Sequence, residues 1–477
     1  MLFSSLEFLC FFFPVFFLCY FVAAKLFPRN IQVRNMVLLV FSLVFYAWGE
    51  LSYLWLLAVS IVFNYLFALA IGHAQKQNRQ AAAKWWLIAD VVLNLALLGV
   101  YKYTGFFVRS INGVLGTDIA VPAIVLPIGI SFFTFQIMSY VIDVFKGTVP
   151  PQKNLFTVAV YLCAFPQLIA GPIVRYADIE DQLAVRTETL DGVYRGMQRF
   201  IVGLSKKVII ANTCAAVCDT LFTYELSSVG AVGAWIGMLT YTLQIYFDFS
   251  GYSDMAIGMG RMMGFDYKEN FLHPYSATSV TDFWRRWHIS LSSFFREYVY
   301  IPLGGNRVGK IRHIFNILVV WALTGLWHGA SWNFVLWGAY YGVLLIIEKL
   351  LYGKYLQKIP VLNRLYTLCA VVFGWVFFRF ESTGAIGEMF ATLFGAHGLT
   401  GSALVRTLGQ SGVDMVFVAA FVIGCTASFP WFVKSRERLL NKKPVALVCC
   451  VASFLLLAAC VLLMETGAYN PFIYFRF

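Results

Sequence analysis

Charged residues are scarce in this sequence, and their scarcity defines the class of protein. Only 13% of the 477 residues are Asp, Glu, Lys or Arg, whereas 60% are hydrophobic. Soluble domains carry about 25% charged residues. No polar block is long enough to form a separate soluble domain. The sequence therefore predicts an all-α polytopic membrane protein, whose chemistry takes place inside the bilayer or at its two faces.

Motifs typical of common enzyme classes are also missing. The chain has no GxSxG turn, no GxxxxGK[ST] loop, no HExxH pair and no GxGxxG after a strand. Its ten cysteines form no CxxC pair and no zinc-binding spacing, so we interpret them as small buried hydrophobic residues. Cys214 and Cys218 have a spacing that suits helix packing as well as metal binding, but no histidine lies beside them. We therefore predict no metal site and no bound cofactor.

The chain carries a net charge of +12, which in a soluble protein would suggest nucleic-acid binding. In a membrane protein the positive-inside rule explains this excess, because Lys and Arg collect in cytoplasmic loops. We therefore expect contact with membrane lipids and none with nucleic acid. One alternation of spans places both termini outside and the basic connections in the cytoplasm, namely Arg29, Arg34, His73, Lys76, Arg79, Lys84, Lys146, Lys153, Lys434, Arg436, Arg438, Lys442 and Lys443.

A helix that crosses the bilayer needs about 20 apolar residues, and fewer where it is buried among others. The first apolar run, Leu6–Ala24, has no basic segment before it and is too long for a signal peptide, so we interpret it as a membrane span. We expect one membrane domain, with N-terminal helices in residues 1–145, a catalytic core in residues 155–350 and C-terminal helices in residues 360–477. About 12 spans are predicted: Leu6–Lys25, Asn35–Trp48, Tyr53–Ile71, Trp85–Phe107, Ile124–Phe145, Val208–Phe222, Ala231–Phe249, Ile314–His328, Trp332–Lys349, Leu365–Phe380, Val413–Trp431 and Pro444–Met464.

Two consecutive segments do not fit the alternation of cytoplasmic and outside connections. Leu155–Tyr176 is apolar enough to cross, but basic residues flank both its ends, and Pro166 and Gly171 interrupt it. We interpret it as a re-entrant or half-crossing segment, which is tolerated only where protein or water covers the freed backbone groups. Asp178–Arg199 then reads as one charged helix on the cytoplasmic face.

Two histidines, each directly after a tryptophan, mark the candidate site. If Thr281–Tyr300 is one helix, Trp284 and Trp287 share an apolar stripe, Arg285 and Arg286 lie away from it, and His288 falls at its edge. Such a partly desolvated imidazole suits a catalytic or substrate-contacting residue. The alternative is an amphipathic interface helix in which the histidine is merely structural.

His328 ends a predicted helix that begins near Arg312 and is too short to cross the bilayer. A second helix returns to Glu348, so Ile314–Lys349 is predicted to form a hairpin whose tip, HGASWN, ends inside the membrane. Gly329 would allow the helix to end in a left-handed conformation. An ionisable residue at that depth is a functional candidate by default, although a structural core histidine remains the alternative.

A histidine can act as general base toward a hydroxyl group that attacks a thioester. Surrounding tryptophans, Trp284 and Trp327 among them, would exclude the water that hydrolyses an activated acyl group. Ser331 and Asn333 can orient the ring of His328 or donate to an oxyanion. Basic residues on the cytoplasmic side can bind phosphates of a donor such as coenzyme A, or be ordinary positive-inside charges; they are Arg285, Arg286, Arg307, Lys310 and Arg312.

Asp248 and Asp254 flank a Gly-Tyr-Ser sequence that predicts a turn before the expected helix Thr281–Tyr300. They can orient the arginines or a histidine, or form structural ion pairs. We therefore assign them a supporting role.

At these motifs the chain resembles the membrane-bound O-acyltransferase (MBOAT) family, of the bacterial alginate O-acetylation (AlgI-like) type. The WRRWHIS and GLWHGASWN sequences are specific together, whereas the apolar stretches are weak singly. The matching segments extend nearly from end to end: Leu126–Gly147, Phe165–Tyr176, Gln244–Phe265, Phe283–Arg307, Gly325–Gly338 and the tail YNPFIYFRF, Tyr469–Phe477.

The resemblance implies a fold with re-entrant and interfacial helices around a central tunnel, in the bacterial cytoplasmic (inner) membrane. It implies that His328 is the active-site histidine and that His288 matches a second, upstream histidine. It further implies a cytoplasmic acetyl donor, expected to be acetyl-CoA, and an extracytoplasmic SGNH-type acetyltransferase partner that modifies a polysaccharide such as alginate or peptidoglycan.

Two other functions stay open at this point. D-alanyl transfer in teichoic-acid modification shares the fold, although the WRRWHIS and YIPLGGNR sequences favour the alginate type. A transporter or polymer-export subunit could use the two histidines as a proton relay. That function would require intramembrane carboxylates near the histidines and internal repeats, and the sequence shows neither clearly.

Overall fold

The computed structural model describes residues 1–169, 171–356, 358–409, 415–430 and 443–466. Every regular element in these ranges is a helix and no strand occurs in them, which confirms the all-α prediction. The basic residues of 434–442, both ends of the predicted span Val413–Trp431 and the tail Tyr469–Phe477 lie outside the described residues.

The packing of the helices divides the chain into two compact units. Unit 1 contains Met1–Phe200 and Met255–Lys268, and unit 2 contains Ile201–Asp254 and Glu269–Phe477. Both candidate histidines therefore belong to unit 2.

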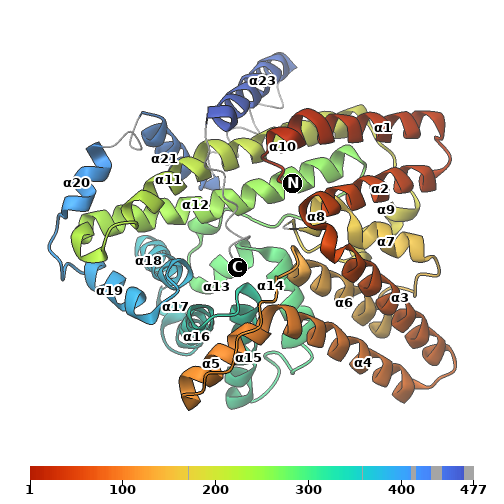
Figure 1. The fold of residues 1–477 in the computed structure, drawn as a ribbon, viewed down its shortest axis with the longest axis horizontal. Coiled ribbons are helices and arrows are strands. Elements are labelled where there is room, and N and C mark those ends of the chain that lie inside the picture. The colour runs from red at the N-terminus through yellow and green to blue at the C-terminus, as the bar shows by residue number, and fades with distance from the viewer. Residues whose placement is uncertain (170, 357, 410–414, 431–442, 467–477) are drawn as a thin grey trace. The chain divides into compact units, whose positions relative to one another are not determined.

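Unit 1 is built mainly from the long helices of the first half of the chain, drawn from red to yellow in Figure 1. Its core contains a cluster of phenylalanines in which Phe165 packs against Phe12, Phe16 and Phe45, with ring centroids 5.0–5.5 Å apart. The helices are η1 (Phe8–Phe12), α1 (Phe13–Leu26), α2 (Ile31–Glu50), η2 (Leu51–Tyr53), α3 (Leu54–Lys76), α4 (Gln80–Leu98), η3 (Gly99–Tyr103), α5 (Thr104–Leu115), α6 (Ile130–Lys146), α7 (Leu155–Cys163), α8 (Phe165–Leu168), α9 (Tyr176–Ala184) and most of α10 (Leu190–Ser205).

The predicted interruption of Leu155–Tyr176 is confirmed, because α7 ends at Cys163 and the four-residue helix α8 follows. Side chains form hydrogen bonds with the backbone groups that the interruption leaves unpaired. Ser42 Oγ accepts from Phe165 N–H at 3.0 Å, and Gln167 Nε2 donates to Tyr161 O at 2.7 Å. A Cβ atom at Gly171 would lie 2.7 Å from Pro166 O, so this close return of the chain requires glycine. The re-entrant placement itself stays a prediction.

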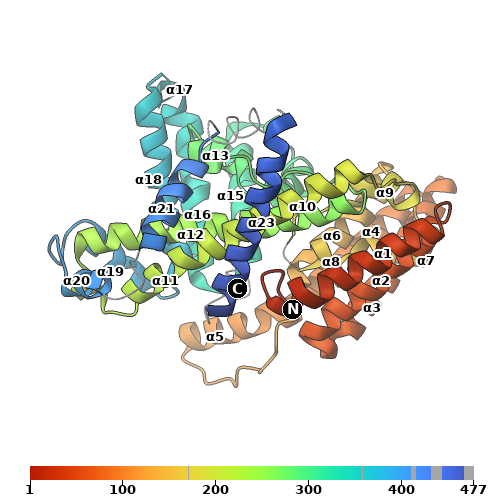
Figure 2. The same cartoon turned by 90° about the horizontal axis from the view of Figure 1, so that it is seen from above.

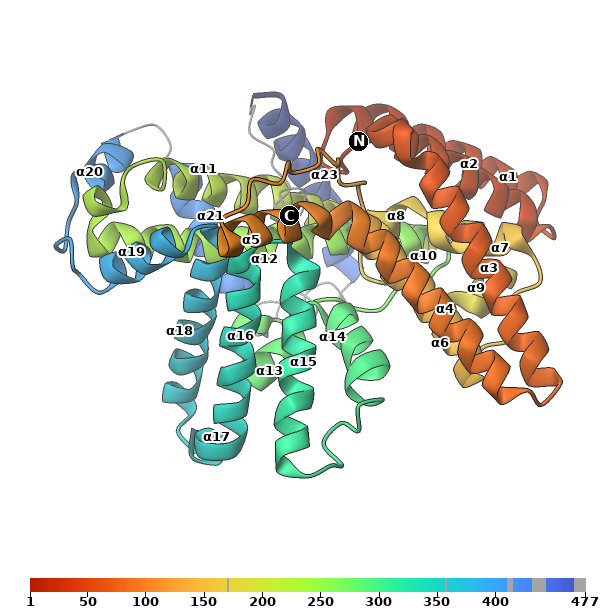
Figure 3. The ribbon, with the colours of Figure 1, turned by 60° about the horizontal axis from the view of Figure 1, so that its bottom comes forward.

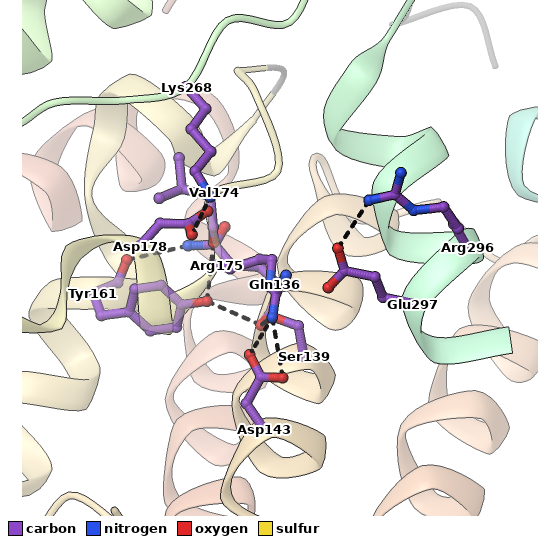
Figure 4. A network of polar contacts seen from close by, with 10 residues as sticks. All are labelled: Gln136, Ser139, Asp143, Tyr161, Val174, Arg175, Asp178, Lys268, Arg296 and Glu297. Carbon is purple, nitrogen blue, oxygen red and sulfur yellow. Dashed lines mark hydrogen bonds and ion pairs between the residues drawn. The ribbon is translucent and has the colours of Figure 1, made fainter. Parts of the chain in front are cut away.

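Ion pairs and hydrogen bonds hold the end of this segment in unit 1 (Figure 4). The Tyr161 hydroxyl lies 3.0 Å from Val174 O and from Gln136 O. Arg175 forms an ion pair with the buried Asp143 at 3.0 Å. Asp143 is therefore bound to a partner and is more than a charge at the end of a span.

The prediction of one helix over Asp178–Arg199 is wrong, because α9 ends at Ala184 and α10 begins at Leu190. The residues between α9 and α10 form contacts with distant parts of unit 1. The Arg186 guanidinium donates to Met263 O at 3.1 Å, and Glu188 forms a 2.6 Å ion pair with Arg34. These contacts replace the hydrogen bonds that a continuous helix would make.

Unit 2 contains the long helix α12, the candidate site and the last helices of the chain. Within it, α16 packs against α15 and against α18, as Figures 2 and 3 show. Its helices are η4 (Lys206–Ala211), α11 (Asn212–Leu221), most of α12 (Leu226–Met262), η5 (Pro274–Ser276), α13 (Val280–Arg286), α14 (Ile289–Phe295), η6 (Arg296–Tyr300), α15 (Lys310–His328), α16 (Trp332–Ile347), η7 (Glu348–Tyr352), α17 (Gly353–Leu356), α18 (Pro360–Arg379), α19 (Thr383–Leu393), α20 (Ser402–Gly409), α21 (Met415–Ala427) and α23 (Lys443–Thr466).

The predicted turn between Asp248 and Asp254 is wrong, because α12 is helical through both residues. Gly251 has a different use. A Cβ atom there would lie 2.6 Å from Gly203 O and 3.2 Å from Lys207 N, so glycine allows α12 to approach the segment at 203–207 closely.

Eight helices or helix pairs in the described residues are long and apolar enough to cross a membrane. They are Phe8–Leu26, Ile31–Lys76, Gln80–Leu115, Leu190–Leu221, Leu226–Met262, Trp332–Leu356, Pro360–Arg379 and Val448–Thr466. Length and composition thus agree with a multi-pass membrane protein, while the expected count of about 12 spans stays a prediction.

Candidate active site

The predicted hairpin is confirmed: α15 and α16 lie side by side and are joined by a tight connection after His328 (Figure 3). Two glycines permit their close contact. A Cβ atom at Gly325 would lie 2.4 Å from Phe334 O, and one at Gly338 would lie 2.4 Å from Trp321 O. The depth of the hairpin tip in a bilayer stays a prediction.

The helix ends at His328, but not through a left-handed glycine. Gly329 has φ −168° and ψ 154°, an extended conformation that any residue adopts. The expected left-handed exit is therefore wrong. Glycine is needed here for space, because a Cβ atom at this position would lie 2.2 Å from ring atoms of Phe334.

His328 is 4% exposed and is enclosed by aromatic rings. The ring centroids of Trp327 and Trp337 both lie 4.9 Å from that of the imidazole, and the centroid of Phe378 lies at 5.3 Å. All three rings meet the imidazole edge to face. Water is largely excluded from such a shell, which favours the transfer of an activated acyl group over its hydrolysis.

Ser331 and Asn333 lie at the hairpin tip, as predicted, and they bind each other through Ser331 Oγ and Asn333 Oδ1. Asn333 is fully buried and donates from Nδ2 to Phe377 O on α18 at 3.0 Å. Its amide thus fastens the tip of the hairpin to α18. A direct role of either residue toward His328 or an oxyanion stays a prediction.

The expectation of one helix over Thr281–Tyr300 is wrong, because the helix breaks at Trp287 and His288. His288 is left-handed, with φ 45° and ψ 56°, and separates α13 from α14. Backbone groups from a preceding segment replace the helical hydrogen bonds: Leu272 N–H donates to Arg286 O at 2.9 Å and Ile289 N–H donates to Asn270 O at 3.0 Å.

The break turns His288 into the interior, where it is 1% exposed. Its Nδ1 atom lies 3.2 Å from Asn270 Oδ1, and its ring meets Phe249 edge to face at 4.7 Å. His288 lies outside the eight candidate spans, and burial lowers its pKa from 6.5 to about 3. At neutral pH the imidazole is therefore uncharged.

Trp327 contacts both histidines. Its ring centroid lies 5.6 Å from that of His288 and 4.9 Å from that of His328. Two imidazoles that are 40 residues apart in the sequence are thereby brought to the same indole ring. This shared contact is the geometric basis for treating them as one site.

The other predicted site residues, Trp284, Arg285 and Arg286, lie in α13. The Trp284 ring packs against Trp321, Trp337 and Tyr341, with centroids 4.8–5.4 Å apart. Trp284 therefore belongs to an aromatic core that includes Trp337, a ring in contact with His328.

Of the two predicted arginines, Arg286 forms an ion pair with Asp282 at 2.8 Å, whereas Arg285 is exposed. The structure adds a contact at the base of the hairpin that the sequence did not indicate. His313 Nε2 lies 2.9 Å from the Tyr300 hydroxyl and 3.1 Å from Lys349 Nζ.

Asp248 and Asp254 pair with adjacent lysines that the sequence analysis did not single out. Lys207 lies 2.6 Å from Asp248, and Lys206 lies 2.6 Å from Asp254. The first pair is almost fully buried, with side chains 3% and 1% exposed. These contacts are structural ion pairs within unit 2, one of the two roles considered for the aspartates.

Sequence reasoning missed Asn270, whose side-chain oxygen lies 3.2 Å from His288 Nδ1. It lies 18 residues before the histidine, in a loop with no periodicity or motif. Its polarity beside the apolar Phe271 was the only signal. In the described residues, no group of three or more His, Cys, Asp or Glu side chains is placed to hold a metal ion.

The sequence profile of MBOAT, the membrane-bound O-acyltransferase family, matches residues 117–383, which include both histidines and more than half of the chain. The chain belongs to this family. It is therefore an O-acyltransferase and a multi-pass membrane protein.

Several curated proteins are similar to it. A probable alginate O-acetylase AlgI of Azotobacter vinelandii is 39% identical over 509 residues, covering 100% of both chains. That of Pseudomonas aeruginosa is 45% identical over 401 residues, covering 83% of this chain and 75% of its own. A peptidoglycan O-acetyltransferase of Helicobacter pylori is 36% identical over 432 residues, covering 84% and 81%. A teichoic acid D-alanyltransferase of Bacillus subtilis is more distant, at 30% identity over 53% of this chain.

Proposed function

We propose that this O-acyltransferase takes acetyl groups from acetyl-CoA on the cytoplasmic side and passes them across the bacterial inner membrane. They would serve the O-acetylation of an exported or cell-wall polysaccharide, of the alginate or peptidoglycan class. The acetylases to which the chain is similar over most of its length support acetyl as the acyl group. The central observation is the pair of buried histidines that contact one indole ring, that of Trp327.

His328 is the proposed general base. Its imidazole removes the proton from a hydroxyl group as the hydroxyl oxygen attacks the thioester carbonyl. The carbon–sulfur bond then breaks, and the proton returns from the imidazolium to the departing thiolate. The aromatic shell of His328 supports this role, because it keeps water from competing with the hydroxyl.

The acyl donor would bind near the base of the hairpin. Arg285 and Arg312 are exposed there, and Lys349 lies beside His313. Cationic groups of this kind bind phosphates through charge-assisted hydrogen bonds. The alternative is that these residues are ordinary positive-inside charges. If they bind the donor, its affinity depends on its phosphates; if they are positive-inside charges only, it does not.

The partner would be an extracytoplasmic SGNH-type acetyltransferase that receives the acetyl group and modifies the polymer. The expected tunnel would connect the two sides of the membrane. D-alanyl transfer is less well supported, because the D-alanyltransferase of Bacillus subtilis aligns with only 53% of this chain, whereas acetylases align with 83–100%.

The test is the substitution His328→Ala, with His397→Ala as a matched control because His397 is an exposed histidine outside the site. Ester-linked acetate of the exported polymer is measured after mild base treatment, together with the amount of chain in the membrane. We expect His328→Ala to abolish polymer acetylation at normal chain levels, while His397→Ala keeps it. Full acetylation in the His328→Ala strain would refute the assignment, and loss of D-alanyl esters in its place would favour the alternative.

A further inference from the structure

Asn270 is fully buried and contacts both His288 and the start of α14. Its side-chain oxygen Oδ1 lies 3.2 Å from His288 Nδ1, 3.2 Å from Ser290 N and 2.9 Å from Ser290 Oγ. Its nitrogen Nδ2 lies 3.2 Å from Ser253 Oγ. One amide therefore holds the imidazole, α14 and α12 in a fixed relation.

The chemistry of these partners determines the orientation of the amide. The backbone nitrogen of Ser290 can only donate, so the atom that faces it must be an acceptor, which is Oδ1. The hydroxyl of Ser253 can accept from Nδ2. A flipped amide would place Nδ2 against the Ser290 N–H, with two donors facing each other.

The orientation of the amide in turn determines the tautomer of His288. Oδ1 of Asn270 can only accept, so the hydrogen between it and Nδ1 must belong to the imidazole. Ser290 agrees with this, because its hydroxyl donates to Oδ1 and its oxygen lies 3.4 Å from Nδ1. A neutral imidazole has one N–H, so a lone pair remains on Nε2.

That lone pair is enclosed in the protein. His288 is 1% exposed, and within the described part of the chain Nε2 has no hydrogen-bond partner. A buried acceptor without a donor is unfavourable, and a ligand that brings an N–H or O–H group relieves the cost. The ring of Trp327 contacts the imidazole of His288 as well as that of His328.

We propose that Asn270 is a positioning residue of the active site: it holds His288 with its hydrogen on Nδ1, so that Nε2 accepts a hydrogen bond from the acyl donor. This rests on the proposed function in one respect, the identity of the donor as acetyl-CoA. The attacking hydroxyl has a single hydrogen, which goes to His328, so the group at Nε2 belongs to the acyl donor. The amides of the pantetheine arm are the N–H groups closest to the thioester.

The tautomer is tested by solid-state NMR of the full chain, labelled with ¹⁵N at histidine, in lipid bilayers at neutral pH. The His288 signals are assigned by their loss in His288→Gln. We expect the Nδ1–H form in the unaltered chain, in Asn270→Asp, which keeps an acceptor oxygen, and in Ser253→Ala. In Asn270→Leu we expect His288 to lose the Nδ1–H form. An Nε2–H form in the unaltered chain, or an unchanged tautomer in Asn270→Leu, would overturn the proposal.

Kinetics of acetyl transfer from acetyl-CoA test the contact with the donor. Loss of one buried hydrogen bond predicts a rise in KM for acetyl-CoA of about threefold to tenfold in Asn270→Leu, with a smaller change in kcat. Asn270→Asp should recover most of the loss. His397→Ala, which changes an exposed histidine outside the site, should keep the KM of the unaltered chain.

A modified acyl donor tests the same contact from the side of the substrate. In an acetyl-CoA analogue, N-methylation of the amide nearest the sulfur removes that N–H. The unaltered chain should use this analogue less well than acetyl-CoA, whereas Asn270→Leu should use the two equally well. Equal losses in both chains, or an unchanged KM in Asn270→Leu, would refute the contact. If His328→Ala keeps transfer, the proposed mechanism fails, while the NMR result still decides the tautomer independently.

Discussion

Glu348 and Thr281, 67 residues apart, are joined by two hydrogen bonds to one carboxylate oxygen. Glu348 Oε1 accepts from the Thr281 N–H at 3.1 Å and from its hydroxyl at 2.5 Å, and Oε2 accepts from the Val280 N–H at 2.8 Å. These N–H groups begin α13 and have no acceptor within the helix. Because Glu348 directly follows α16, this carboxylate ties the segment that leads to His288 to the hairpin that carries His328.

We expect Glu348→Ala to lower both stability and activity. The buried N–H of Val280 would lose its acceptor, at a cost of about 1–3 kcal/mol. The start of α13 would become free to move, which would displace Trp284 and His288. Thermal unfolding in detergent and polymer acetylation measure the two effects. Glu388→Ala is the control, because Glu388 is exposed on α19, and an equal effect of both substitutions would contradict the capping role.

Gly329→Ala should disturb the hairpin tip. The added methyl group would lie 2.2 Å from the ring of Phe334, so that ring or the tip must shift, typically at about 1–3 kcal/mol. Gly329→Ala combined with Phe334→Leu should recover part of the activity, because the smaller side chain makes room. Wild-type acetylation in Gly329→Ala alone would show that the tip tolerates the methyl group. Gly384→Ala is the control, since no atom lies within 4 Å of a Cβ there.

Lys207 and Asp248 form a buried ion pair, so removal of one partner should cost more than removal of both. Lys207→Met removes the buried lysine that pairs with Asp248, which predicts a loss of about 3–5 kcal/mol or failure to accumulate in the membrane. The double substitution Lys207→Met with Asp248→Leu should recover most of that loss. Additive effects in this double-mutant cycle, measured by thermal unfolding, would argue against a direct pair.

Trp327→Ala should increase hydrolysis of the donor relative to transfer. It removes the ring that contacts both histidines and opens their surroundings to water. With radiolabelled acetyl-CoA, free acetate should rise while polymer-bound acetate falls about tenfold or more, and Trp327→Phe should be intermediate. The control is Trp332→Ala, which removes an exposed tryptophan of the same hairpin. An unchanged ratio of hydrolysis to transfer in Trp327→Ala would contradict the role of the ring in excluding water.

The chain alone determined the class of protein and the residues to consider. Its low charge and high hydrophobicity predict membrane helices because an unpaired charge is costly in lipid. The short apolar run before Gly329, followed by a second one, predicts the α15–α16 hairpin, since helix length follows directly from residue number. The two Trp-His pairs indicate His288 and His328 as candidates, and between His313 and Glu348 the sequence has no Asp, Glu, Lys, Arg or His other than His328.

Only the tertiary structure decided how the site is held together. Helical periodicity describes contacts within one turn or two, so it predicted a helix that continues through His288. In the structure, hydrogen bonds from Leu272 N–H to Arg286 O and from Ile289 N–H to Asn270 O replace the helical ones there. The capping carboxylate of Glu348 and the lysine partners of the two aspartates also come from distant parts of the chain. Such contacts leave no periodic signal, because each depends on two segments that meet only after the chain has folded.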